Sequence, residues 1–205
     1  MAIAKKTDLK YIIDDLSSVL VQSTPIEITK GSGSTPDSIV IAPDYDLPVT
    51  VDTLQTSGSE PSITHYKVIG LDTDWTSSTT SGDWTIQFTV PTLHTKVLEF
   101  AFGADAINDV TASIGTGAGA GVVEEGDYHG ISVTFNKKKV ACSLVIVNGT
   151  LDRMVIIRKA NLWAHVLKEA NDDPYAVQFT GTIETVGQDL IVLEKDGQTN
   201  LPKKS

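Results

Sequence analysis

The chain is poor in several kinds of residue, and each shortage excludes a class of protein. A single cysteine, Cys142, excludes an internal disulfide framework and any zinc site built from several cysteines. No uninterrupted run of about 18 apolar residues occurs, which excludes a membrane-spanning helix. The first residues lack the apolar stretch of a secretory signal, so we expect the protein to be made and assembled in a cytoplasm.

Cations are scarce in the middle of the chain. Residues 31–136 hold only Lys67 and Lys96 against fourteen acidic side chains, a net charge of −12, whereas the whole chain has a net charge of −10. This balance argues against a dedicated nucleic-acid binder, because affinity for phosphate groups depends on cationic side chains. Two explanations stay open: solubility conferred by net charge, or a surface that repels something anionic.

Motifs for catalysis and for metal binding are also missing. Four histidines occur without metal-ligand spacing: His65, His94, His129 and His165. The glycine run at residues 115–121 lacks the Gly-Lys-Ser/Thr of a phosphate loop. No nucleophile elbow is present, and Cys142 lies in an apolar run typical of a buried strand. We therefore expect no enzyme activity, no catalytic residue, no metal site and no cofactor.

Alternating apolar and polar residues predict a mainly β protein. Residues 84–90 alternate well, with Trp84 and Phe88 on one face and Thr85 and Gln87 on the other. Asn148-Gly149, after the apolar run 140–147, is a strong hairpin signal. Further extended segments are expected at residues 154–166, 175–180 and 190–193. Short strands separated by turn residues at this spacing predict an antiparallel β-sandwich or barrel.

Helical spacing of apolar residues occurs twice. It predicts an N-terminal helix over about residues 8–21 and a flanking helix over about 92–102, with Thr92 as its N-cap and Gly103 as its stop. The glycine-rich and acidic stretch 104–130 is expected to be a long loop, and residues 56–61 an exposed loop. We expect one domain over residues 1–205, with an N-terminal arm or helix at about 1–24 and a frayed end at about 196–205.

Two parts of the chain resemble the major tail proteins that build the tail tubes of long-tailed bacteriophages. In residues 154–185, an Ala-Asn-Leu strand centre at 160–162 is followed by the turn Asp-Asp-Pro at 172–174 and by Thr-Gly-Thr-Ile at 180–183. Upstream, the alternating strand 84–90 leads through Pro91 into the helix that ends VLEFAFG at 97–103. The resemblance covers about residues 63–194 and leaves the N-terminal helix and the stretch 104–130 without a counterpart.

The resemblance implies a structural virion protein with no enzyme activity. Six copies would form a ring, and stacked rings would form a hollow tail tube through which DNA passes during ejection without specific binding. The partners implied are other copies of the chain, the tape-measure protein, and the tail-terminator and tail-tip proteins, with no membrane. The protein would be located in the virion tail after assembly in the host cytoplasm.

The charge map adds candidate residues to this expectation. A bore lined with acids would not hold DNA, because each cation on its wall would add affinity for phosphate. The candidates for acidic residues facing the bore are Asp72, Asp74, Asp83, Glu124, Glu125 and Asp127. The candidates for contacts between stacked rings are Asp44, Asp46, Leu47, Leu54 and Glu60. Two alternatives stay open: another virion component, such as a decoration or head-completion protein, and a carbohydrate-binding β-sandwich module with Trp75 as its exposed aromatic residue.

Overall fold

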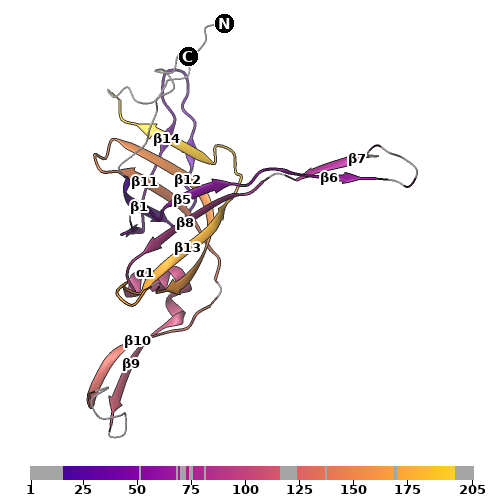
Figure 1. Cartoon of the computed structure of the whole chain (residues 1–205). Coiled ribbons are helices and arrows are strands. Elements are labelled where there is room, and N and C mark those ends of the chain that lie inside the picture. Colours follow the sequence, from indigo (N-terminus) through magenta and orange to yellow (C-terminus); the bar gives the residue numbers. More distant parts are fainter. Residues whose placement is uncertain are drawn as a thin grey trace.

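An eight-stranded antiparallel sheet forms the body of the protein in a computed structural model (Figure 1). The model describes residues 16–50, 52–67, 69, 73, 76–80, 82–115, 124–136, 138–168 and 170–196. In spatial order, the strands are β4 (Tyr45–Leu47), β1 (Leu16–Gln22), β11 (Val140–Asn148), β12 (Arg153–Leu167), β13 (Ala176–Ile183), β8 (Trp84–Val90) and β5 (Gln55–Gly58), and β14 (Leu190–Glu194) pairs with the first half of β12. The expected β class is confirmed, and the described residues form no closed barrel.

The sheet curves around one apolar core. Val19 and Val21 of β1 belong to the same buried cluster as Phe88 of β8 and Phe179 of β13, although these strands lie near opposite ends of the sheet. The rings of Phe88 and Phe179 stack with their centroids 5.1 Å apart. Burial of apolar surface from both halves of the sheet therefore stabilises its curvature.

One short helix, α1 (Thr95–Phe102), covers the open end of this core. Its buried face includes Phe100, whose ring lies 5.4 Å from that of Phe179. The helix stops at Gly103, where φ is +97°, which confirms the expected glycine stop. It starts later than expected, because the N-cap is His94, whose Nδ1 accepts a hydrogen bond from the Lys96 N–H, while Thr92 Oγ1 accepts from the His94 N–H.

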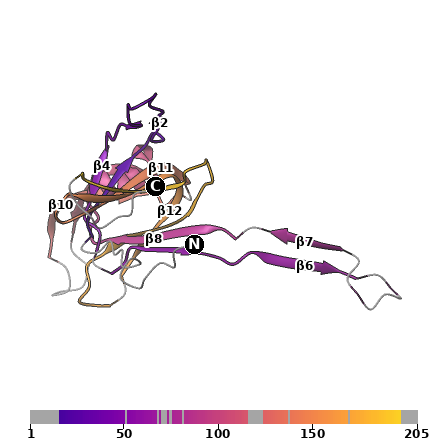
Figure 2. The same cartoon turned by 90° about the horizontal axis from the view of Figure 1, so that it is seen from above.

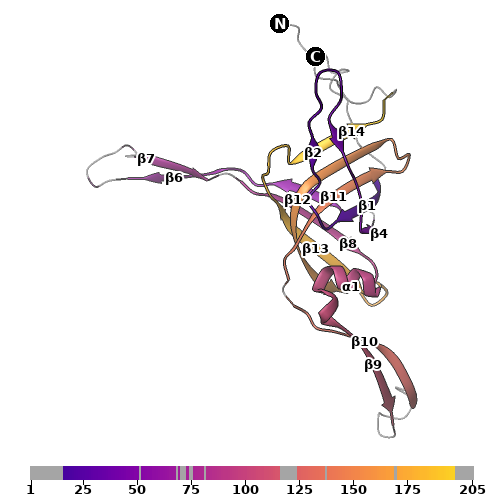
Figure 3. The ribbon, with the colours of Figure 1, turned by 180° about the vertical axis from the view of Figure 1, so that it is seen from behind.

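A second apolar cluster covers the other face of the sheet over β11 and the first half of β12. Val145 and Ile156 contribute to it from the sheet, and Ile26 and Ile39 from the segment that carries the hairpin of β2 (Ile28–Thr29) and β3 (Ser38–Ile39). Figure 3 shows this hairpin in front of β11 and β12. Both faces of the sheet are therefore covered at this end, which explains the continuous apolar run at residues 140–147.

Two further hairpins extend away from the body in different directions (Figures 1 and 2). One pairs β6 (Ser62–Tyr66) with β7 (Thr76–Thr80) and continues the ladder of β5 and β8 outwards. The other follows the short 3-10 turn η2 (Ala104–Ala106) and pairs β9 (Ile107–Ile114) with β10 (Gly126–Val133). Every described residue of β6 and β7 is exposed.

Three of the sequence-based expectations are wrong. A helix is expected over residues 8–21, but residues 16–22 form strand β1. Residues 8–15 lie outside the described part of the chain. Strand β1 buries Val19 and Val21 on one face and packs Leu20 on the other, and this pattern imitates helical spacing. The loops expected at 104–130 and 56–61 contain β9, β10 and β5. These strands are almost wholly exposed, so no buried face marks them in the sequence.

Candidate assembly surface

Part of the sheet is open along both of its edges. Strand β5 ends the sheet, and no strand in the described part of the chain pairs with its outer side. On the opposite side, β11 pairs with β12 only as far as Leu162, so residues 163–167 of β12 have β13 on one side and no described strand on the other. The four-stranded portion β5–β8–β13–β12 therefore has two free edges, which are the usual sites of pairing with another chain.

The two free edges run in opposite directions. Each neighbouring pair in this portion is antiparallel, so β5 is parallel to β13 and antiparallel to β12. If the β5 edge of one copy met the β12 edge of the next, the antiparallel pattern would continue without a break. Repetition of this heterologous contact would give a closed ring or an open helix, depending on the rotation between copies.

The free edge of β5 presents the main-chain groups of Thr56. The Ser59 N–H donates to the Asp83 carbonyl at 2.9 Å, and Ser59 and Asp83 continue the register of β5 with β8. Main-chain groups alternate in direction along a strand, so Gln55, Ser57 and Ser59 face β8, whereas the N–H and C=O of Thr56 point outwards. A partner strand would be hydrogen-bonded at Thr56.

The four-stranded portion has one apolar face and one polar face, and three neighbouring rows of the polar face carry no charge. The apolar face packs on the core cluster and α1. The register aligns Trp163, Thr180, Gln87 and Gln55 across the other face in one row. The rows on either side consist of Asn161, Thr182, Thr85 and Ser57, and of His165, Gln178 and Thr89. We call these eleven residues the neutral face, since none bears a charge when His165 is neutral.

An ion-pair group borders the neutral face. Glu184 pairs with Lys159, lies 4.0 Å from Lys139 Nζ, and accepts a hydrogen bond from Asn161 Nδ2. The hydrogen bond from Lys159, followed by that from Asn161, lowers the pKa of the Glu184 carboxyl. At the far end of β12, Lys168 Nζ donates to two main-chain carbonyls of the next turn. The cations nearest to this face are thus already engaged within the chain.

The lowered pKa of Glu184 predicts a pH-dependent contribution to stability. The pKa of Glu184 is lower in the folded protein than in the unfolded chain, where it is about 4.5. The ionised carboxyl therefore stabilises the fold at pH values above 4.5, and this contribution is lost as the pH falls through the pKa of the folded protein. A Glu184→Gln variant should therefore unfold at lower denaturant concentration than wild type at pH 7, and the gap should narrow in acid. Urea titrations at several pH values measure this, and a gap that stays constant with pH would contradict it.

The acidic candidates for the bore are spread over two regions. Asp83 is exposed immediately before β8, while Glu124, Glu125 and Asp127 are exposed at the far end of the β9–β10 hairpin. Asp83 continues the register of β8 one row beyond Thr85 and so lies at the edge of the neutral face, whereas the other three belong to the separate β9–β10 hairpin. Asp72 and Asp74 fall outside the described residues, as does Trp75.

The candidates for contacts between rings differ in exposure. Asp44, Asp46 and Glu60 are exposed, and the Ser23 N–H donates to Asp44 at 2.7 Å, which lowers the pKa of that carboxyl. Leu54 packs against the core cluster, and Leu47 is only 2% exposed within it. The Leu47 side chain therefore belongs to the core and is not available for contacts between rings. Asp44 and Asp46 beside it are exposed.

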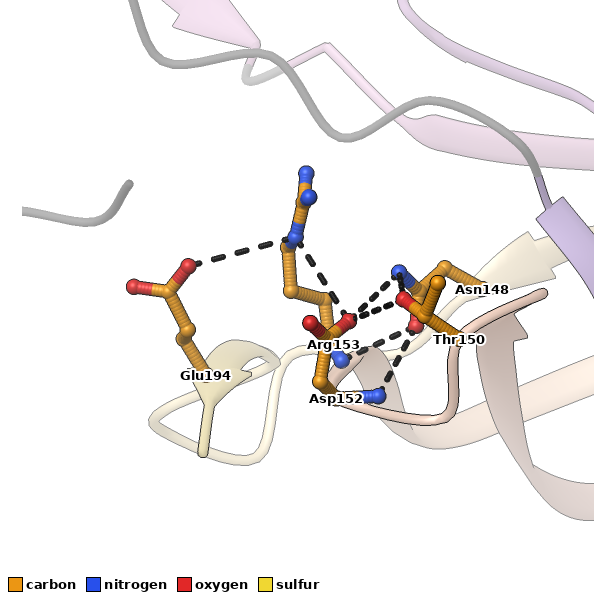
Figure 4. Close-up of polar contacts among 5 residues, drawn as sticks. All are labelled: Asn148, Thr150, Asp152, Arg153 and Glu194. Carbon is orange, nitrogen blue, oxygen red and sulfur yellow. Dashed lines mark hydrogen bonds and ion pairs between the residues drawn. The ribbon is translucent and has the colours of Figure 1, made fainter. Parts of the chain in front are cut away.

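The turn between β11 and β12 carries a compact polar network (Figure 4). Asn148 Oδ1 accepts from the N–H groups of Asp152 and Arg153, and Asn148 Nδ2 donates to Thr150 Oγ1 at 2.8 Å. Hydrogen bonds from Thr150 and Asn148 lower the pKa of Asp152. Arg153 Nε lies 3.7 Å from Asp152 and 3.9 Å from Glu194. The expected Asn-Gly hairpin is confirmed, and these polar groups hold the turn.

The described residues show no cluster that could hold a metal ion. In the described ranges no three or more His, Cys, Asp or Glu side chains gather to form a metal site. Cys142 is 3% exposed, as expected for a residue of the apolar run, and burial raises the pKa of its thiol to about 12. Within the same ranges, no helix is long and apolar enough to cross a membrane.

Two tryptophans that lie in strands are exposed. Trp84 is 59% exposed where β8 leaves the body, and Trp163 is 40% exposed on the neutral face. The sequence alternation of β8 and β13 already separates Thr and Gln from the apolar residues. The sequence does not show that these polar residues lie next to those of β5 and β12, Trp163 included. The pairing of the four strands shows it.

Comparison with known proteins leaves the geometry as the main guide to function. No protein-family model matches this chain, and no curated protein matches it.

Proposed function

We propose that this chain is the subunit of a bacteriophage tail tube. In this proposal copies of the chain join side by side into rings, six copies in each as in the tail proteins that the sequence resembles, and the rings stack into a hollow conduit for DNA. In this proposal the curved sheet with its flanking helix is a β-sandwich of the tail-tube type. The tape-measure, tail-terminator and tail-tip proteins are its further partners, and the assembled protein belongs to the virion tail.

One observation carries the proposal: a four-stranded sheet with two free edges of opposite direction. A monomer with such edges is prone to uncontrolled pairing unless its own copies cover them. Pairing of the β5 edge with the β12 edge of the next copy satisfies both edges at once and extends the sheet from subunit to subunit. A closed ring of such sheets removes every free edge of this portion.

The projecting hairpins are expected to form contacts between rings. A two-stranded hairpin that packs on nothing is marginally stable in water, so the exposed β6–β7 hairpin is expected to gain contacts from a partner. It carries exposed Ile63 and Tyr66. Glu60 lies at its base, and Asp44, Asp46 and Leu54 are the other candidates for contacts between stacked rings.

The electrostatics suit a conduit for DNA. Lys67 and Lys96 are the only cations among residues 31–136, and Lys96 pairs with Glu99 at 2.7 Å on the helix. DNA that met few free cations would not be held by phosphate contacts. In the proposed tube, Asp83, Glu124, Glu125 and Asp127 add negative charge along the DNA path, together with Asp72 and Asp74.

Electron microscopy of the purified protein tests the proposal directly. Concentrating the protein should convert small species into stacked rings or long hollow rods, and light scattering should show the rising mass. Closed oligomers that never stack would favour a decoration or head-completion protein. A monomer at every concentration would contradict self-assembly.

A carbohydrate-binding β-sandwich module is the second candidate. The exposed Trp163 among amide and hydroxyl side chains is the observation that favours it, because sugar sites combine an aromatic surface with polar groups. Binding on a glycan array that Trp163→Ala abolishes, in a protein that stays monomeric, would support this alternative over the tube.

A further inference from the structure

We propose that Trp84 anchors the contact between neighbouring copies by packing its ring, across the edge strand β5, on Ala164 of the next copy. The inference rests on the proposed pairing of the β5 edge with the β12 edge, and it gives that pairing a register and a side-chain anchor. The partner is a second copy of this chain, through the free residues 163–167 of its β12.

The indole of Trp84 lies over the free edge strand. Trp84 pairs with Gly58 of β5, and a Cβ on Gly58 would lie 3.2 Å from three atoms of the six-membered ring. The ring therefore occupies the space of a side chain at position 58, where glycine is otherwise unfavourable in a strand. Trp84 is nevertheless 59% exposed, and exposed tryptophans of this kind are enriched in contacts between proteins.

The free edge of β12 presents the main-chain groups of Ala164 and Val166. The Glu184 N–H donates to the Lys159 carbonyl at 3.0 Å, one position beyond the ladder of β12 with β13. Main-chain groups alternate along a strand, so from residue 159 to 167 the odd-numbered residues face β13 and the even-numbered ones face the other way. Leu162 is the last residue that pairs with β11, which leaves Ala164 and Val166 at the free edge.

One register satisfies the outward main-chain groups of both edges. Gly58 follows Thr56 by two residues, so its N–H and C=O also point outwards from β5. Antiparallel pairing of Thr56 with Val166 places Gly58 opposite Ala164, and both pairs are then hydrogen-bonded. A shift by two residues would place Gly58 opposite Leu162, which β11 already occupies.

In this register Trp84 extends the apolar core of the next copy. Strands of one sheet lie about 4.7–4.9 Å apart, so a ring that covers Gly58 reaches the methyl group of Ala164 beside it. Ala164 pairs with the buried Phe179 in the same row. Both Ala164 and Val166 pack against the core cluster and are only half-buried in the single subunit. The indole would remove this apolar surface from water.

Disulfide cross-linking between copies tests the register. Ser57 and His165 would face each other between the two hydrogen-bonded pairs, with their Cα atoms about 4.5 Å apart, which a disulfide can span. Within one copy β8 and β13 separate these strands, so a bond in Ser57→Cys/His165→Cys joins two copies. Ser57→Cys/Trp163→Cys is the matched control, because a diagonal pair lies about 7–8 Å apart. The native Cys142 is 3% exposed and does not compete.

The expected result is a ladder of cross-linked species from Ser57→Cys/His165→Cys. After mild oxidation, non-reducing gels should show dimers, trimers and larger multiples, and reduction should return the monomer. The control pair and each single variant should cross-link at least about tenfold less, because their sulfur atoms cannot meet without movement of the main chain.

Trp84→Ala tests the anchor separately from the register. Truncation of an interface hot spot costs about 2 kcal/mol or more, so the concentration needed for assembly should rise about thirtyfold. Trp84→Phe keeps an aromatic ring and should recover part of this loss. Because the indole is 59% exposed in the single subunit, urea unfolding of the unassembled variants should stay close to wild type.

The remaining outcomes overturn separate parts of the inference. Assembly of Trp84→Ala at the wild-type concentration, or unfolding of this variant, shows that the indole does not anchor the contact. Preferred cross-linking of Ser57→Cys/Trp163→Cys, or no cross-link in either pair while wild type assembles, overturns the register and leaves self-assembly standing. Failure of the wild-type protein to assemble overturns the proposed function and the inference with it.

Discussion

A Thr56→Pro variant is expected to remain folded and to lose the ability to form rings. Thr56 lies on the exposed edge strand β5, where its N–H points away from β8 and bonds to nothing in the ladder with β8. Proline removes this N–H and is tolerated on edge strands, so the fold of the subunit loses no ladder hydrogen bond. The next copy, however, loses the donor that its β12 edge requires.

The size of the effect follows from the unsatisfied acceptor. Leaving a buried carbonyl of the neighbouring β12 without its hydrogen bond costs about 1–3 kcal/mol, and 1.4 kcal/mol corresponds to a factor of about ten in affinity. Because each ring contains the contact several times, the losses accumulate around it. The concentration needed for assembly should therefore rise by about fivefold to a hundredfold at each interface, and rings should disappear at concentrations where wild type forms them.

Thr56→Val is the matched control. Valine keeps the main-chain N–H and favours strands as strongly as threonine does. Size-exclusion chromatography with light scattering should show wild-type assembly for Thr56→Val and a monomer for Thr56→Pro, with equal circular dichroism for both monomers. Normal rings from Thr56→Pro would exclude the β5 edge as the joining surface.

A Phe179→Ala variant is expected to lose about 3–5 kcal/mol of unfolding free energy. Phe179 is fully buried, and its ring contacts Phe88 of β8 and Phe100 of α1, with centroids 5.1 Å and 5.4 Å away. Its removal leaves a cavity where the sheet meets the helix. Domains are commonly stable by about 5–15 kcal/mol, so this single change would remove a large part of the total.

Tyr175→Ala provides the comparison within the same region of the chain. Tyr175 precedes β13, is 55% exposed, and has Lys168 Nζ 5.3 Å from its ring centroid. Loss of an exposed contact of this kind costs about 1 kcal/mol or less. Denaturant unfolding of the two variants measures the difference. Equal effects would mean that the Phe179 cluster is not the core that joins sheet to helix.

Local sequence signals predicted those elements whose two faces differ within this chain. In β8, Ile86 and Phe88 alternate with Thr85 and Gln87 because one face packs on the core and the other does not. The stop of α1 at Gly103 was predictable because a positive φ favours glycine. Asn148-Gly149 predicted a hairpin at the right place, but the loop spans residues 149–152 and has its positive φ, +58°, at Leu151.

Local signals failed where burial depends on distant segments. Strand β1 pairs with β11 across more than a hundred residues of sequence, and the apolar pattern of residues 16–22 is equally compatible with a helix until that pairing is known. The exposed hairpin β9–β10 has no buried face in the subunit, so residues 107–114 resemble a loop. The resemblance to tail proteins likewise left this stretch without a counterpart.

The sequence by itself determined the β class, the shortage of cations in the central stretch, the missing catalytic motifs and the strands with one buried face. Only the tertiary structure decided which strands are neighbours, and hence that residues from four separate strands form the neutral face between two free edges. The physical reason is that side-chain alternation is a local property of one strand. Register and strand order, in contrast, depend on main-chain hydrogen bonds between segments far apart in sequence, which no short stretch of residues encodes.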